Sequence, residues 1–290
     1  MSSPLLSVLL PCRNGARTLA LALRSVLNQT FSDFELLLLN DGSTDDSVAI
    51  ACSLDDSRIR IIGDGVGRGL PWRLNEGVTL ARGRYIARMD ADDVCFPERF
   101  AQQVAYLDAH STVDLVGCRA VVFRDSGEVV GLLPFAPDHA ALCAQPWRNI
   151  PLAHPTWMGR RSWFEAHPYR LPEVRRAEDQ ELLLRSYLDS HYACLDEVLL
   201  GYRQGAFQLQ RTLVARRALL AAQLRLFAQR GEWGNAARAA ALSSIKIVLD
   251  VLAAFPGGET LFFLRMGAPV SAAVRITLRQ SLAESEGLAP

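Results

Sequence analysis

The stretch Tyr85-Ile86-Ala87-Arg88-Met89-Asp90-Ala91-Asp92-Asp93 decides the class of fold. Its first five residues are mostly apolar, which is typical of a short buried strand, and three carboxylates follow within four residues. Mutual repulsion makes such a cluster costly unless a cation or hydrogen-bond donors offset it. Carboxylate oxygens suit Mg²⁺ or Mn²⁺, so the cluster favours a metal site. The alternative is a solvated turn in which Asp93 caps the next helix.

Upstream of this stretch, short apolar runs alternate with amphipathic segments. Strands are predicted at Leu5–Leu10, Glu35–Leu39 and Arg58–Ile62, with helices that begin near Arg17 and Thr44. This order predicts an α/β domain with a mixed, mainly parallel sheet flanked by helices. Ligands of such sheets bind beyond the carboxyl ends of the strands. We therefore expect three strand-end clusters to converge on one edge: Pro11–Asn14, Asn40–Ser43 and Asp90–Asp93.

The remaining pattern divides the chain near residue 205. The expected elements, in order, are a helix from Trp72 to Ala81, a helix ending near His110, strands Val113–Phe123 and Val129–Leu133, a loop-rich stretch 134–172, a helix Glu178–Ser190 and a strand Val198–Arg203. Everything beyond Gln204 has a helical pattern. We therefore expect one domain over residues 1–205, in halves 1–110 and 111–205, and a C-terminal helical extension over 206–290.

Length and charge narrow the class of protein further. The chain has 290 residues, half of them hydrophobic, which is enough for a large core and excludes disorder along the whole length. Its formal net charge is zero, which argues against a nucleic-acid binder. That zero conceals a gradient, because the residues from Gln204 onward hold 10 basic and 5 acidic side chains. The front of the chain is therefore acidic and the back is basic.

The six cysteines are scattered, without a CxxC pair, which favours reduced thiols in a cytoplasmic protein. The segment Met1–Leu10 lacks the basic start of a signal peptide, and no run of 18 uncharged apolar residues suggests a membrane span. The glycine-rich loop Gly63–Gly69 lacks the placement of a nucleotide fingerprint. Lys246 is the only lysine, so no Walker lysine exists. This loop is interpreted as a flexible edge of the substrate site, or as a plain loop.

Glu178 and Asp179 open a helix late in the domain. Carboxylates at a helix start interact favourably with the helix dipole, which is the purely structural interpretation. The functional one makes one of them a general base, held near a reaction centre by a rigid element.

Together, the motifs resemble family 2 glycosyltransferases, inverting nucleotide-sugar transferases with the Rossmann-like GT-A fold. The matching pieces span about 200 residues: Ser7–Asn14, Ser25–Thr30, Asn40–Asp45, Gly69-Leu70, Leu74–Gly77, Ala81–Ile86, Met89–Asp93, Pro97–Arg99 and Glu178-Asp179. The resemblance implies a GT-A catalytic domain over 1–205, with a nucleotide-binding half at 1–110 and an acceptor half at 111–205.

The resemblance also implies a role for each matching residue on the donor side. Pro11 and Asn14 would hold the nucleoside, and Asp41 would contact the base, usually uracil, which favours a UDP-sugar. The family often has Asp-Asp where this chain has Asn40-Asp41. Arg73 lies where the family commonly has a basic residue near the diphosphate. The alternative is that Arg73 is an ordinary surface arginine. Asp90 and Asp92 match the D-x-D pair that contacts ribose and holds Mn²⁺ or Mg²⁺.

On the acceptor side, Asp179 matches the catalytic base, with Glu178 as its neighbour. The hydroxyl of a glycan or lipid-linked acceptor would attack C1 of the sugar in one displacement, which inverts its configuration. His154 and Trp157 are weaker candidates for acceptor contact, the alternatives being a packed loop histidine and a core aromatic. No Gln-x-x-Arg-Trp cluster of processive synthases is present, so a single addition is expected, in cell-surface polysaccharide synthesis.

The helical tail leaves two interpretations open. Leu213, Leu220, Leu224 and Phe227 share one helical face, with arginines around it. In the first interpretation, that face packs on the domain or on a second copy of the chain. In the second, it lies on the inner face of an anionic membrane, and Leu261–Leu264 inserts as an apolar wedge. Two further functions remain as alternatives: a sugar-phosphate nucleotidyltransferase, and a catalytically inactive glycosyltransferase-like binding module.

Overall fold

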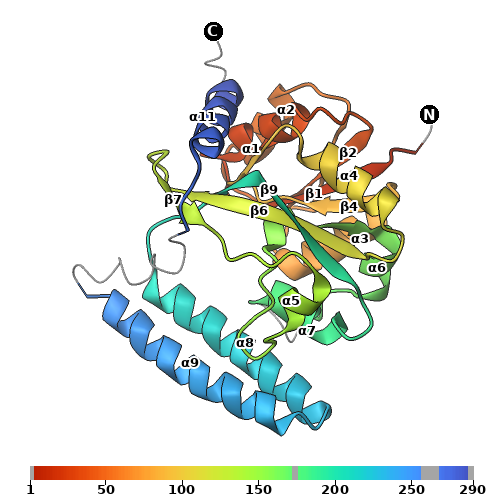
Figure 1. Cartoon of the computed structure of the whole chain (residues 1–290). Helices are drawn as coiled ribbons and strands as arrows, with labels where there is room; N and C mark the ends of the chain where they lie inside the picture. Colours follow the sequence, from red (N-terminus) through yellow and green to blue (C-terminus); the bar gives the residue numbers. More distant parts are fainter. Residues whose placement is uncertain (1–2, 172–175, 256–267, 287–290) are drawn as a thin grey trace.

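The computed structural model describes residues 3–171, 176–255 and 268–286. A twisted sheet crosses the middle of the molecule, with helices on both faces and a helical hairpin below it (Figure 1). The predicted apolar run Leu261–Leu264 lies outside the described residues.

The sheet has the strand order β3-β2-β1-β4-β8-β6-β9-β5, with β7 paired to β6. Its strands are β1 Leu6–Cys12, β2 Phe34–Asn40, β3 Ile59–Ile62, β4 Tyr85–Arg88, β5 Val94–Cys95, β6 Leu115–Phe123, β7 Val129–Leu132, β8 Met158–Arg160 and β9 Tyr192–Arg203. The pairs β1–β2, β1–β4, β2–β3 and β6–β9 are parallel, and β8 joins the two halves through antiparallel pairs. The predicted mixed, mainly parallel sheet is thus confirmed.

Helices cover both faces because the strands are apolar on both sides. On one face, the core of β1, β2 and β4 packs against helices α1 Leu19–Leu27, α2 Ser47–Ser53 and α4 Arg99–Ala109. On the other face, it packs against α3 Leu70–Leu80, α6 Arg161–Ala166 and α7 Glu178–Ser186. Residues of β2 alternate accordingly, since Leu36 and Leu38 join the first core and Leu37 and Leu39 the second.

Beyond residue 205 the described chain is helical. Helices α8 Leu209–Gln229 and α9 Trp233–Ala253 lie side by side in the hairpin, and α11 Ala272–Glu286 packs beside α1 (Figure 1). The face of α8 that is buried carries Leu226 and Phe227, which join the second core. Leu224, predicted to share the face of Phe227, is instead 38% exposed, so the predicted apolar face of this helix is only partly right.

The loop-rich stretch 134–172 contains more regular structure than the sequence predicts. It holds α5 His139–Cys143, a 3₁₀ turn at His154–Thr156, β8 and α6. The two-residue strand β5 was also unexpected, and β9 begins at Tyr192 rather than near Val198. Strands of two or three residues are too short to display a period, and β9 is interrupted by register shifts opposite Cys118–Ala120, which hide its first half.

Candidate active site

Three strand ends meet at one edge of the sheet, as predicted. β1 lies between β2 and β4, with Cys12 opposite Asn40 and Leu9 opposite Arg88. The loops after these parallel strands therefore leave the sheet at the same edge.

Hydrogen bonds join the first two of these loops directly. The amide oxygen of Asn14 accepts from the backbone N–H of Thr44 at 2.8 Å, and the N–H of Asn14 donates to Ser43 Oγ at 3.0 Å. Asp45 accepts from the N–H of Ala16 at 2.9 Å and from Ser47, so it ties the turn to α2. Pro11 is half-buried and Asn14 is exposed with a positive φ of 53°. Of the two predicted nucleoside contacts, Pro11 thus lies near the end of β1, and Asn14 lies in the loop that these bonds join to the loop after β2.

Asp41 follows β2 and is only 6% exposed. Its carboxylate accepts from the backbone N–H groups of Arg68 at 2.6 Å and Gly69 at 3.0 Å, and from Arg73 Nε at 3.3 Å. The loop Gly63–Gly69 therefore closes over Asp41. Gly42 makes this closure possible, because its φ is +69° and a Cβ there would lie 2.8 Å from the backbone nitrogen of Gly67.

Arg73 is not a surface arginine, because its side chain is fully buried. Its Nη1 donates to Glu76 at 2.8 Å, and its Nη2 donates to Asp64 and to the carbonyl of Val66, both at 2.6 Å. These bonds hold the pKa of Asp64 far below its usual value. Arg73 thus lies beneath Asp41 and fixes the glycine-rich loop, with its donor groups engaged by the protein itself.

The acidic cluster lies at the end of β4. One carboxylate oxygen from each of Asp90, Asp92 and Asp93 falls within 4.8 Å of the others. Asp93 is 1% exposed, accepts from the N–H of Arg203 at 2.8 Å, and caps no helix, so the solvated-turn alternative is wrong. Loss of solvation, with the charge of Asp90, raises the pKa of Asp92 to about 6, and the pKa of Asp93 is raised by the same causes.

These residues fit a divalent cation. Hard oxygen ligands within reach of one another are what Mg²⁺ and Mn²⁺ require. Oδ2 of Asp93 is buried and has no hydrogen-bond partner in the described part of the chain. Loss of solvation and the neighbouring carboxylates raise the pKa values of Asp92 and Asp93, and a bound cation would favour their charged forms. Asp93 is a candidate ligand that the sequence argument left out, although it stands in the same motif.

Glu178 and Asp179 begin α7, directly after Ala177, whose φ of 56° turns the chain into the helix. Loss of solvation and the charge of Asp179 raise the pKa of Glu178 to about 7. Loss of solvation also raises the pKa of Asp179, opposed by hydrogen bonds from Gln180 and by the charge of Arg88. A carboxylate whose pKa is raised in this way is a stronger base than one in water.

A small groove lies beside Asp179. It is a cavity of about 160 Å³, lined by Asp179, Gln180, Leu133 and Pro134, and by the loop Asn149–Ala153. Gln180 fixes that loop, since its side chain accepts from the N–H of Ile150 at 3.0 Å and donates to its carbonyl at 3.1 Å. This loop could not be recognised from the sequence, because its proline and apolar residues carry no chemical motif.

The predicted acceptor residues are buried behind this groove. His154 is 6% exposed and its Nε2 lies 2.7 Å from the hydroxyl of Tyr169. Burial and the charge of Arg88 hold its pKa well below the usual value, so the ring is neutral. Trp157 has no exposed area and its indole N–H donates to the carbonyl of Leu152 at 3.1 Å. The prediction that Trp157 contacts an acceptor is therefore wrong: it is a core aromatic.

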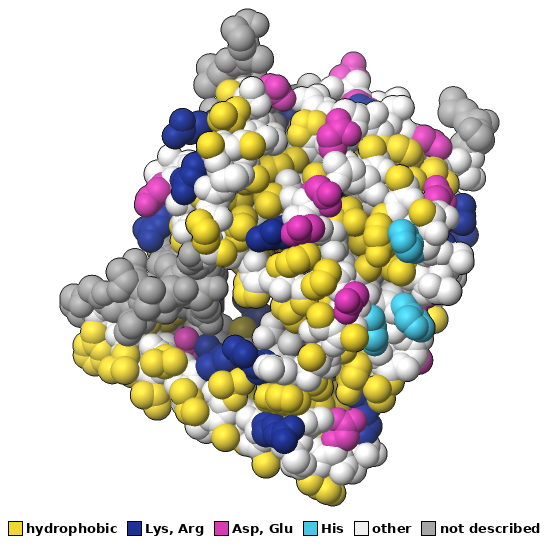
Figure 2. Space-filling view, in the orientation of Figure 1, with side chains coloured by type: hydrophobic (Ala, Val, Ile, Leu, Met, Phe, Trp, Pro, Cys, Tyr) yellow, Lys and Arg dark blue, Asp and Glu magenta, His cyan; other side chains and the backbone are white. Residues whose placement is uncertain are grey.

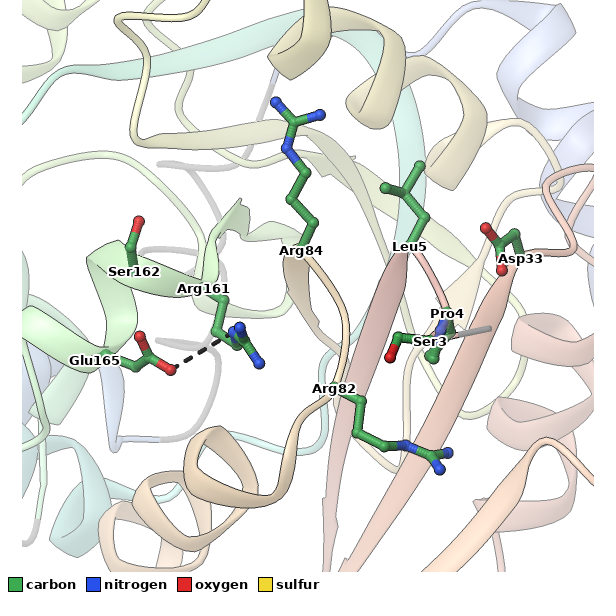
Figure 3. A pocket seen from close by; sticks show the side chains of 9 residues that line it. All are labelled: Ser3, Pro4, Leu5, Asp33, Arg82, Arg84, Arg161, Ser162 and Glu165. Atoms are coloured by element: carbon green, nitrogen blue, oxygen red, sulfur yellow. Dashed lines mark ion pairs between the residues drawn. The ribbon is translucent and has the colours of Figure 1, made fainter. Parts of the chain in front are cut away.

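Another cavity, of about 480 Å³, lies at the opposite edge, where β1 and β4 begin (Figure 3). Arg82, Arg84 and Arg161 line it. Each is already paired with a carboxylate, as the contact of Arg161 with Glu165 in Figure 3 illustrates. Among the described residues, this cavity holds no cluster of carboxylates that could bind a metal, so we assign the chemistry to the carboxyl edge.

The fold is that of an α/β protein whose ligands bind at the carboxyl edge of the sheet, where the polar loops of this chain meet. The model of glycosyl transferase family 2 matches residues 7–167, which is more than half of the chain. EpsE of Bacillus subtilis, which carries the name of a glycosyltransferase, is 35% identical over 192 residues, covering 64% of this chain and 68% of that protein. The chain therefore belongs to glycosyl transferase family 2, and the enzyme class expected from the motifs, a glycosyltransferase, is confirmed.

Solved structures agree on the fold. S. aureus TarS 1–349 in complex with UDP-GlcNAc has a TM-score of 0.60 at 17% identity, covering 98% of this chain and 81% of that one. Glucosyl-3-phosphoglycerate synthase from Mycobacterium tuberculosis, in complex with Mn²⁺, UDP and phosphoglyceric acid, has a TM-score of 0.57 at 18% identity, covering 77% of this chain and 78% of that one. The GT-A fold expected from the motifs is confirmed.

Proposed function

We propose that this transferase moves a single sugar from a nucleotide-sugar donor, a UDP-sugar, to a glycan or lipid-linked acceptor, with inversion at C1. The observation that carries the proposal is the meeting of the Asp90–Asp93 cluster and the Asp41 loop at one edge of the sheet, with α7 presenting Asp179 beside a groove. Cell-surface polysaccharide synthesis, in the cell envelope, is the process we assign to it.

The donor lies across the three strand ends in this proposal. Pro11, Asn14 and Asp41 contact the nucleoside, and Asp90 contacts its ribose. Arg73 acts indirectly, because its side chain is buried and holds Asp41 and the glycine-rich loop in place. The TarS and synthase complexes, which contain UDP-GlcNAc and UDP, support uridine as the base.

Asp92, with Asp90 and Asp93, would hold the cation. A bound Mn²⁺ or Mg²⁺ supplies Lewis-acid stabilisation of the charge that develops on the departing diphosphate. The Mn²⁺ complex of the mycobacterial synthase supports this choice of ion. The buried position of Asp93 and its bond to Arg203 keep the cluster in one arrangement before the donor arrives.

Asp179 acts as the base on the acceptor side. It takes the proton of the attacking hydroxyl as the new bond to C1 forms and the C1–oxygen bond to the diphosphate breaks. The opposite face of the sugar is attacked, so one displacement inverts the configuration. Glu178 shares the start of α7 with Asp179, and the groove formed by Asn149–Ala153 is where the acceptor hydroxyl would approach Asp179.

The donor is tested by thermal denaturation with UDP-, GDP-, dTDP- and CMP-sugars, each with and without Mn²⁺. A UDP-sugar with Mn²⁺ is expected to raise the melting temperature most, because a ligand that binds only the folded state stabilises it. The absence of a metal-dependent shift with every donor would refute the proposal.

We also propose that α8 and α9 bring the site to the inner face of an anionic membrane, near a lipid-linked acceptor. An apolar stripe is formed by Ile245, Val248, Leu249 and Leu252 on α9 and by Phe255 just beyond its end. These side chains are 48–62% exposed and follow helical spacing. Hydrophobic side chains gather over this end of the hairpin in Figure 2. Exposed Arg211 and Arg217 on α8 match an anionic surface. Among the described residues, no helix has the length and apolarity needed to cross a bilayer.

Flotation with vesicles tests this membrane contact. Vesicles of phosphatidylglycerol and phosphatidylcholine are expected to bind the full chain, and phosphatidylcholine alone to bind less. Leu249→Glu should abolish flotation, whereas Leu188→Glu, at a residue 66% exposed after α7, serves as the matched control. Equal flotation of the two variants would reject the α9 stripe as the contact, and self-association of the chain through α9 would then be examined by sedimentation.

A further inference from the structure

Arg88 is a buried cation inside the candidate site that the motif argument did not use. It ends β4 on the same side of the strand as Ile86, facing the second core. Its backbone N–H donates to the carbonyl of Trp157 at 2.9 Å, and its carbonyl accepts from Arg99 Nη2 at 2.8 Å. The residue is 4% exposed. Its backbone is thus fixed on both sides, and its side chain cannot turn to solvent.

The side chain makes one strong contact. Nη2 lies 2.5 Å from Asp90 Oδ1. Within the described part of the chain, Nε and Nη1 are buried and have no hydrogen-bond partner. Arg73, which is also buried, donates from all three of its nitrogens. Buried guanidinium groups normally satisfy their donors in that way, so Arg88 is unusual and calls for a functional reason.

The charges around Arg88 come from two directions. Asp92 and Asp93 belong to the acidic cluster, and the charge of Arg88 opposes the rise in their pKa values. Glu178 and Asp179 belong to α7, and Arg88 likewise opposes the rise in theirs. Arg88 thus faces the side of the sheet on which α7 packs, and its charge favours the charged forms of both groups of carboxylates.

We propose that Arg88 is a positioning residue that links the two halves of the reaction centre, holding Asp90 in the metal-binding cluster through Nη2 and serving as the counter-ion of the Glu178–Asp179 pair. This inference rests on the proposed function. Without Arg88, Asp90 would lose its anchor, and the carboxylates at the start of α7 would lose a cation that favours their charged forms.

The test compares Arg88→Gln and Arg88→Lys with the wild type. Arg84→Gln is the matched control, because Arg84 directly precedes the same strand but is exposed and pairs with Asp108 at the other edge. Thermal denaturation first establishes that each variant is folded. Calorimetry then measures the affinity for a UDP-sugar with Mn²⁺, and release of UDP during turnover gives kcat and the donor KM.

Arg88→Gln is expected to weaken metal-dependent donor binding about tenfold and to lower kcat about a hundredfold, because both halves lose a charged partner. Arg88→Lys keeps the positive charge but loses the planar guanidinium with its several N–H groups. Affinity for the UDP-sugar should therefore stay within about threefold of the wild type, while kcat falls about tenfold. Arg84→Gln should change none of these quantities by more than about twofold.

A folded Arg88→Gln with wild-type kcat would overturn the inference, and so would a loss confined to donor affinity. If Arg88→Gln does not fold, Arg88→Lys decides, since an unchanged kcat in that variant would contradict the positioning role. A wild-type chain that binds no nucleotide sugar in the presence of metal would instead refute the proposed function. The two failures are therefore distinguishable.

Discussion

Asp41 and the Glu178–Asp179 pair are both acidic and both lie at the candidate site, yet their surroundings are opposite. Asp41 is enclosed by donors, namely two backbone N–H groups and the guanidinium of Arg73. Glu178 and Asp179 are enclosed by low-polarity surroundings that raise their pKa values. We assign recognition to a carboxylate that is held still by its donors, and chemistry to carboxylates that loss of solvation makes more basic.

Asp179→Asn is expected to have the largest effect on turnover. Removing the base should lower kcat by about a thousandfold, while calorimetric donor affinity stays within about threefold. The matched control is Asp138→Asn, an aspartate that caps α5 by accepting from the N–H of Ala141 at 2.9 Å. Substantial residual turnover in Asp179→Asn would show that Asp179 is not the base, and the assignment of different roles to Asp179 and Asp41 would then fail.

Asp92→Asn should act on the donor instead. Loss of one metal-binding carboxylate is expected to weaken Mn²⁺-dependent binding of a UDP-sugar about a hundredfold, which calorimetry with and without Mn²⁺ measures. Asp108→Asn, on α4, changes the same charge where that helix contacts Arg84 at the start of β4, and should leave binding unaltered. If UDP-sugar binding depends on Mn²⁺ to the same extent in the wild type and in Asp92→Asn, then Asp92 does not hold the ion.

Asp41→Asn should affect stability and recognition together. An amide can no longer accept from all the donors around this position, so the free energy of unfolding should fall by about 2 kcal/mol and donor affinity about tenfold. Urea denaturation measures the first and calorimetry the second. Asp45→Asn, in the exposed neighbouring turn, is the control and should cost less. A purely catalytic defect in Asp41→Asn would contradict its assignment to recognition.

Glu178→Gln should have the smallest effect of the four substitutions, and it should stabilise the folded state. Its folded pKa of about 7 lies above the ordinary 4.5, so the folded state favours the neutral form. The stability that this preference contributes is present at low pH and is lost as pH rises from about 4.5 through 7. Glu178→Gln should therefore be more stable than the wild type by about 1 to 2 kcal/mol near pH 8, and by much less near pH 5, in urea denaturation. Equal stability at both pH values would argue against desolvation of this pair.

The donor edge could be predicted from the sequence because its signals are local. Each strand end places a polar cluster directly after an apolar run, and parallel strands bring their ends together. The start of α7 was also recognisable, because paired carboxylates open a helix. The different surroundings of Asp41 and Asp179, by contrast, could not be predicted, because they depend on which groups lie around each carboxylate after folding.

The rest of the site depends on tertiary packing. The burial of Arg73 and Arg88 could not be predicted, since arginine is usually exposed and only the folded chain supplies their partners. The groove beside Asp179 depends on Gln180 holding a loop 30 residues away, and β8 joins the two halves of the sheet with three residues. Trp157 failed as an acceptor contact because an aromatic residue in a loop has no local sign of burial.

The most direct test of the account is a crystal of the full chain soaked with UDP and Mn²⁺. We predict an anomalous peak for Mn²⁺ beside Asp92, at about 2.0–2.2 Å from a carboxylate oxygen as expected for a hard cation, with the uracil against Asp41. A peak away from the Asp90–Asp93 cluster, or a nucleotide bound at the opposite edge of the sheet, would contradict it.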